Sequence, residues 1–175
     1  MSSVAVVASV AVLLVASVII CPSNGITGDI LAAICSQTQN QETCEAILES
    51  DPRTGSADLP LLSLVSLELL SKQADKNHNS FVQFRENSTD LDLKRSFGNC
   101  VTGYNDMQGK IKVALRLSQK RQYKRINELG QLIKLAYGCE NGLPSNSPTS
   151  GITETMLLTS QTAVYVNQFL ITSFG

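Results

Sequence analysis

The sequence predicts an all-α protein, an antiparallel four-helix bundle preceded by a short helical hairpin. Long segments carry apolar residues at alternating spacings of three and four, which form one face of a helix with 3.6 residues per turn. Short stretches with turn-forming residues separate these segments, as at Asp51–Gly55 and Leu143–Ser150. Amphipathic helices joined in this way bury their apolar faces as a bundle of antiparallel neighbours.

The first 25 residues are typical of a secretory signal peptide. No charged side chain precedes Asp29, and residues 4–20 are apolar apart from serine. An uncleaved signal anchor is the alternative, because such a run nearly spans a bilayer. We expect residues 1–25 to be removed and residues 26–175 to form one exported domain that is not attached to a membrane.

We expect a helical hairpin and a turn over residues 26–55, and the four-helix bundle over residues 56–175. Two short helices are expected over Ile26–Ser36 and Gln41–Ser50, separated by a polar stretch. The turn Asp51–Gly55 follows, in which Pro52 fixes one φ angle.

Four long helices are expected after this turn. The first runs from about Ser56, a candidate N-cap, to Arg85, and the Asn77–Asn79 segment is expected to loosen its middle. The second begins at Thr89, which forms a capping-box pattern with Asp92. Its apolar stripe consists of Leu93, Phe97, Cys100, Tyr104, Met107, Ile111 and Ala114. The third and fourth are expected over residues 122–140 and 151–174.

Export makes the cysteines structural, and four remain after the leader is removed. Four cysteines allow three pairings. Proximity across the hairpin favours Cys35–Cys44, and the apolar faces of the second and third long helices favour Cys100–Cys139. Export also gives meaning to the sequon at Asn87, which we expect to be glycosylated.

The cysteine segments resemble the plant invertase and pectin methylesterase inhibitor family. The residues that carry the resemblance are the C-x8-C segment from Cys35 to Cys44 with internal Thr38 and Asn40, Asp51-Pro52-Arg53, Ala57-Asp58-Leu59, Cys100-x3-Tyr104-x-Asp106, Ala114-Leu115 and Cys139. Gln41 departs from the proline usual in the family, and Gln131–Gly138 departs from its usual small-residue run. The resemblance implies a secreted plant protein of the cell wall, with the same bundle, hairpin and two disulfides.

The resemblance implies a protein that inhibits pectin methylesterase by capping its substrate cleft in a 1:1 noncovalent complex. Inhibition of invertase is the alternative. Invertase inhibitors of the family carry a Pro-Lys-Phe motif in the turn between the second and third long helices, where this chain reads Arg121-Gln122-Tyr123-Lys124. A carrier with a small ligand between the helices is a third hypothesis.

The sequence contains no residue pattern that is typical of an enzyme active site. Ser-His-Asp and Cys-His sites need a histidine beside the nucleophile. His78 is the single histidine of the chain, and it lies in a polar, asparagine-rich stretch. No spacing typical of a zinc site and no glycine-rich phosphate loop occurs. We therefore expect no catalytic residue, no metal and no cofactor. The net charge of −1 also excludes a nucleic-acid binder that depends on overall positive charge.

A run of basic residues without any acid lies between Lys110 and Arg125. Its candidate partner-facing members are Lys112, Arg116, Lys120, Arg121 and Lys124. The members at 112, 116 and 120 share one helical face. The run predicts either a solvated face or a docking patch for anionic pectin or an acidic partner, because local positive charge steers such ligands.

Overall fold

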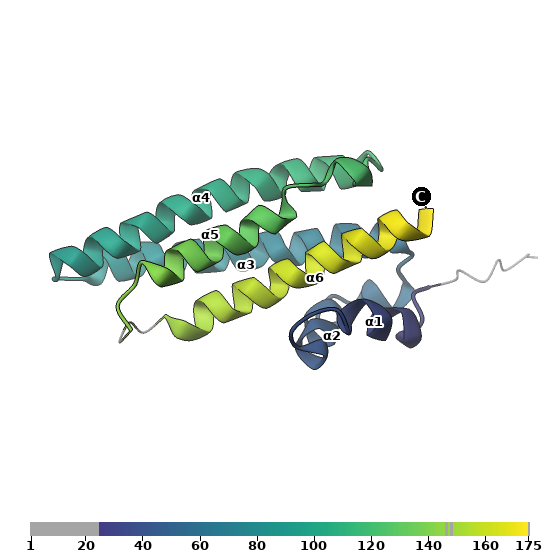
Figure 1. Ribbon diagram of the computed structural model, residues 1–175, viewed down its shortest axis with the longest axis horizontal. Coiled ribbons are helices and arrows are strands. Elements are labelled where there is room, and N and C mark those ends of the chain that lie inside the picture. Colours follow the sequence, from purple (N-terminus) through teal and green to yellow (C-terminus); the bar gives the residue numbers. More distant parts are fainter. Residues whose placement is uncertain (1–24, 146, 148, 175) are drawn as a thin grey trace, which may run out of the picture.

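The computed structural model describes residues 25–145, 147 and 149–174, drawn in Figure 1 as helices joined by short turns. The predicted signal peptide therefore lies outside the described residues, except for Gly25. All regular structure in this part of the chain is helical, with six α-helices and two 3-10 turns. The all-α prediction is confirmed.

Four long helices form the bundle: α3 (Leu59–Asn87), α4 (Leu91–Gln119), α5 (Leu129–Asn141) and α6 (Ser150–Phe174). Both α3 and α5 pack against α4 and α6, so the four helices enclose one core. Successive helices run in opposite directions (Figure 1), which is the predicted antiparallel arrangement. In the described part of the chain, no helix combines the length and apolar character that crossing a bilayer requires.

Aspartates begin the two longest helices. The Asp58 carboxylate accepts a hydrogen bond of 2.8 Å from the backbone N–H three residues further on. The Asp90 carboxylate accepts two, at 2.8 and 3.0 Å, from the first turn of α4. A carboxylate here satisfies unpaired N–H groups and interacts favourably with the helix dipole. The N-caps predicted at Ser56 and Thr89 are therefore wrong by two residues and one residue.

The apolar stripe predicted for α4 lies in the core. Its members from Phe97 to Ala114 are buried, and Leu93 packs against them half-buried. The ring of Tyr104 stacks on Phe81 of α3, with centroids 5.4 Å apart. The α3–α4 contact is therefore built on large aromatic side chains, which bury much apolar area per residue.

Asn77 joins three helices from inside the bundle. Its amide donates to the Tyr104 hydroxyl at 2.9 Å and to the Ile152 carbonyl oxygen at 3.0 Å. Its own oxygen accepts from the Gln73 amide at 2.7 Å. α3 runs without interruption through this point, so the expectation that Asn77–Asn79 loosens the helix is wrong.

The third long helix is shorter than predicted. A 3-10 turn, η2 (Tyr123–Arg125), follows α4, and α5 begins only at Leu129. Ile126 is buried although it lies outside any helix. In the sequence, the apolar residue at this position continues the helical spacing of α5. A buried turn residue and a core residue of a helix cannot be distinguished by this spacing, so the predicted helix began too early.

The hairpin consists of α1 (Gly28–Cys35) and α2 (Gln41–Glu49). It packs against α6 at one end of the bundle (Figure 1). Ile34 and Leu48 of the hairpin share a second apolar cluster with Val166 of α6. α6 therefore contributes side chains to both apolar clusters of the molecule.

Two disulfides cross-link the fold. Cys35 and Cys44 join the two hairpin helices, with Cα atoms 5.5 Å apart. Cys100 and Cys139 join α4 to α5, with Cα atoms 4.7 Å apart. Each bond thus connects helices that are neighbours both in sequence and in space.

An ion-pair cluster fixes the turn between hairpin and bundle. The Arg53 guanidinium donates to both carboxylate oxygens of Asp51, at 2.8 and 2.7 Å, and also to Glu68 of α3. The Thr54 hydroxyl donates to the Leu48 carbonyl oxygen at 2.6 Å. The paired charges tie the turn to α3, so they set the direction in which the hairpin enters the bundle.

We expect part of the stability to be lost in acid through Asp51. Hydrogen bonds from Arg53 hold the pKa of Asp51 well below its usual range. A carboxyl whose pKa is lowered by folding stabilises above its unfolded-state pKa of about 3.9, and this contribution fades as the pH falls toward the folded-state pKa. Asp51→Asn should therefore destabilise at pH 7, by an amount that shrinks below about pH 4.

Urea unfolding followed by circular dichroism between pH 7 and pH 2 measures this effect. Asp106→Asn, at an exposed position of α4, is the matched control. A stability deficit of Asp51→Asn that stays constant across the range would contradict the assignment to the Asp51–Arg53 pair.

Candidate partner-binding surface

Three basic side chains follow the outer face of α4. The buried positions of this helix, among them Ile111 and Ala114, point into the core. Lys112, Arg116 and Lys120 are spaced four residues apart and exposed, as their shared helical face predicts. Val113 lies beside them with half of its surface exposed.

Lys110 belongs to the same basic run but has a local partner. Its ammonium nitrogen lies 3.2 Å from a carboxylate oxygen of Glu128, just before α5. The pair connects α4 to the α4–α5 turn. Because of this ion pair, Lys110 is less available than the other basic residues of the run for contact with a binding partner.

The turn after α4 has an unusual backbone. Arg121 has φ +56°, in the left-handed region. The N–H of Arg121 donates to the Ser118 carbonyl oxygen and that of Gln122 to the Leu117 carbonyl oxygen, both at 2.8 Å. This is the Schellman motif, in which glycine usually holds the left-handed position. An arginine there costs about 1 kcal/mol of backbone strain.

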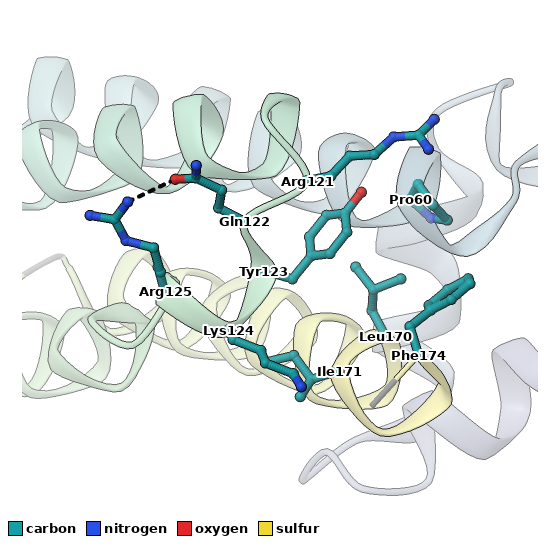
Figure 2. Close-up of a pocket in the computed structure, with 9 residues that line it drawn as sticks. All are labelled: Pro60, Arg121, Gln122, Tyr123, Lys124, Arg125, Leu170, Ile171 and Phe174. Atoms are coloured by element: carbon teal, nitrogen blue, oxygen red, sulfur yellow. Dashed lines mark hydrogen bonds between the residues drawn. The ribbon is translucent and has the colours of Figure 1, made fainter.

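The turn covers a hollow of about 440 Å³ at the end of the bundle. Residues 121–125 line one side, Pro60 of α3 lies at its edge, and Leu170, Ile171 and Phe174 of α6 line the other side (Figure 2). Phe174 is largely exposed. The hollow thus combines an apolar surface with basic side chains.

Tyr123 projects its phenol ring into this region (Figure 2). Partial burial raises the pKa of its hydroxyl, the nearby Arg121 charge opposes this rise, and the Asp58 charge adds to it. The hydroxyl is therefore protonated at neutral pH and available as a hydrogen-bond donor.

The five basic residues singled out in the sequence divide into two groups. Lys112, Arg116 and Lys120 follow the α4 face, whereas Arg121 and Lys124 border the hollow. The contribution of Phe174 to the hollow was missed. In the sequence, an isolated aromatic residue at the end of an amphipathic helix does not indicate contact with a turn about 50 positions earlier in the chain.

The other candidates from the sequence are the histidine, a metal site and the glycosylation sequon. His78 is half-buried on α3, and its Nδ1 lies 3.3 Å from the Asn79 amide oxygen. Residues 25–145, 147 and 149–174 contain no group of three side chains that could hold a metal ion. Asn87 is exposed at the C-terminal end of α3, where its side chain is accessible.

The comparisons with known proteins agree on one family. The model of the plant invertase/pectin methylesterase inhibitor family matches residues 29–168. A pectinesterase inhibitor of Actinidia deliciosa is 28% identical over 131 residues, which are 73% of this chain and 71% of that protein. A Platanus orientalis protein named "Putative invertase inhibitor" is 26% identical over 124 residues, 67% of this chain and 73% of that protein.

A solved structure shares the architecture. The crystal structure of a mutant form of a pectin methylesterase inhibitor from Arabidopsis superposes with a TM-score of 0.71. The match covers 79% of this chain and 95% of that one, at 18% identity. At this identity the match shows that the two chains have the same fold.

Proposed function

Because this chain belongs to the plant invertase/pectin methylesterase inhibitor family, whose members are inhibitors and not enzymes, we propose that it inhibits pectin methylesterase. In this proposal the folded protein leaves the cell, binds the enzyme in a 1:1 complex and blocks access to the substrate cleft. The 28% identity to the Actinidia pectinesterase inhibitor carries the proposal.

The fold supports inhibition by surface binding. α3 and α4 each have 29 residues, so each is about 43 Å long at 1.5 Å per residue. Helices of this length can supply the roughly 800 Å² that one partner buries in a stable complex. The two disulfides hold the helices together before binding, and a preorganised surface loses little conformational entropy on association.

The α4 face is our candidate for part of the interface. Val113 is exposed next to Lys112 and Arg116, so this face offers an apolar contact beside two positive charges. In interfaces of this kind, apolar and charged side chains contribute unequally, and a few dominate the binding energy. The charges would act mainly on the rate of encounter with an acidic surface.

Charge reversal tests this face. Lys112→Glu with Arg116→Glu should leave the fold intact, because both side chains are exposed and have no ion-pair partner among the described residues. Association with pectin methylesterase should slow about tenfold at low salt and less at high salt, where screening is stronger. Surface plasmon resonance at several ionic strengths measures it, with Lys134→Glu on α5 as control. Association rates that match wild type at every salt concentration would leave only a solvated face.

Invertase is the second candidate target. The Platanus relative supports it with nearly the same identity and coverage. The turn residues 121–124 read Arg-Gln-Tyr-Lys, without the Pro-Lys-Phe motif that the family's invertase inhibitors carry. This difference favours pectin methylesterase.

Parallel titration distinguishes the two targets. Purified residues 26–175 are added to a fixed concentration of pectin methylesterase and, separately, of acid invertase. We expect saturable loss of pectin methylesterase activity at a 1:1 ratio and recovery after the proteins are separated. Inhibition of invertase alone would transfer the proposal to that enzyme. Inactivation that persists after separation would contradict a noncovalent complex.

Export predicts two covalent features of the mature protein, which are a glycan at Asn87 and an N-terminus created by signal-peptide cleavage. Asn87 should carry a glycan when the chain is secreted from plant cells, because its sequon is exposed at the end of α3. Peptide mapping by mass spectrometry, with and without glycosidase, measures this occupancy and the N-terminus left by signal cleavage. Asn99→Gln, which changes an exposed asparagine outside a sequon, is the control and should leave the glycan in place. A fully unmodified Asn87 peptide would refute the glycan.

A further inference from the structure

We propose that the hollow at the end of the bundle, between η2 and the last turn of α6, binds a small amphipathic carboxylate. Its volume of about 440 Å³ lies in the range of about 300–1,000 Å³ that is usual for small-molecule sites. The site is separate from the outer face of α4, and its occupation does not depend on the enzyme-inhibitor proposal.

The apolar body of such a ligand would contact α6 and the tyrosine. Leu170 and Phe174 lie one helical turn apart and face Tyr123 across the hollow (Figure 2). Phe174 leaves most of its surface exposed to water. A ligand that covers it would remove apolar area from water, which is the main driving force for binding at such sites.

The carboxylate would meet the basic side chains. Arg121 and Lys124 line the hollow, and neither has an ion-pair partner among the described residues. Arg125 differs because its guanidinium donates to the Gln122 side chain at 2.9 Å (Figure 2). The planar guanidinium of Arg121 is suited to a carboxylate, since it can donate two parallel hydrogen bonds.

One acidic residue lies close to the hollow but outside its lining. Asp58 lines an adjoining hollow together with Arg121, where its carboxylate accepts the N-cap hydrogen bond of α3 at 2.8 Å. The lining of the main hollow contains three basic residues and no acidic one. A carboxylate is therefore favoured over a neutral or cationic ligand of the same shape.

The residue type at position 121 is also informative. Its φ of +56° belongs to a position at which glycine would relieve strain. The Schellman motif that ends α4 accounts for this φ by itself, so the informative point is that an arginine occupies a position where glycine is usual. The arginine places a guanidinium in the lining of the hollow, which glycine could not do.

Paired probes test the proposal without any enzyme. Octanoate and 1-octanol, and 2-naphthoate and 2-naphthol, are titrated into the ¹⁵N-labelled protein, and amide shifts are followed by NMR. We expect shifts centred on residues 121–125 and 170–174, with each carboxylate binding at least about tenfold more tightly than its alcohol, as a charge-assisted hydrogen bond provides. Comparison of the two carboxylates shows whether an aliphatic or an aromatic body fits better.

Variants at one position separate the guanidinium from the fold. Arg121→Asn tolerates the left-handed backbone but removes the charge, so carboxylate affinity should fall about tenfold while alcohol affinity stays unchanged. Arg121→Lys should lose less. Arg121→Gly should lose carboxylate affinity equally and raise the thermal midpoint by about 2–5 °C. Lys112→Asn on the α4 face is the matched control and should bind as wild type does.

Three results would overturn the proposal. These are equal affinity for carboxylate and alcohol, unchanged carboxylate affinity in both Arg121→Asn and Lys124→Gln, or the absence of amide shifts around the hollow at 5 mM of both carboxylates. Since none of these measurements includes pectin methylesterase or invertase, failure here leaves the inhibitor proposal intact.

Discussion

Replacing Cys100 and Cys139 together by alanine should lower the free energy of unfolding by about 4 kcal/mol. The two residues are separated by 39 positions, and the loop that their bond closes restricts the unfolded chain by roughly this amount. The loss is a large part of the 5–15 kcal/mol that stabilises a typical domain. Urea denaturation followed by circular dichroism measures it, and inhibition should weaken in parallel as the folded fraction falls.

The second disulfide is the internal control. Cys35 and Cys44 are only nine positions apart, so their double replacement by alanine should cost about 1 kcal/mol less on the same loop-entropy relation. It should loosen the hairpin more than the bundle. Equal costs, or a larger cost for the hairpin bond, would show that native-state packing outweighs loop closure. Recovery of a Cys44–Cys100 peptide by non-reducing mapping would refute the pairing itself.

Asn77→Ala should destabilise by about 2–4 kcal/mol although it removes only one small polar side chain. The variant leaves the Tyr104 hydroxyl and the Ile152 carbonyl oxygen without their shared partner inside the bundle. Each unsatisfied buried group costs about 1–3 kcal/mol. Thermal and urea unfolding measure the change in the free energy of unfolding.

Asn79→Ala is the matched control, because Asn79 is exposed on the same helix. It should change stability by less than about 0.5 kcal/mol. Tyr104→Phe removes one of the two acceptors, so a double-mutant cycle with Asn77→Ala should give a coupling energy of about 1 kcal/mol. Additive effects of the two variants would mean that the hydrogen bond between them contributes nothing.

The sequence was sufficient for features that are encoded locally. The α4 stripe is a repeat of apolar residues along one segment, and it predicted the buried face from Phe97 to Ala114. The α4–α5 turn was harder to predict. Ile126 is buried in a turn, and its apolar character in the sequence resembles the first core position of a helix.

Features that depend on distant partners could not be predicted. Asn77 suggested a loosened helix because its neighbours are polar. Its partners Tyr104 and Ile152 lie 27 and 75 positions away, and their positions in space follow only from the packing of three helices. The hollow beside Arg121 is a similar case, since it forms where Pro60 and Phe174 meet the same turn.

α6 contributes to both apolar clusters, through Met156 and Ala163 to the bundle and through Val166 to the hairpin. Either cluster alone keeps part of α6 packed, so this helix is released only when both clusters open. Backbone amides in the middle of α6 should therefore exchange their hydrogens with solvent only when the whole molecule unfolds. Their exchange rates would report the global free energy of unfolding residue by residue.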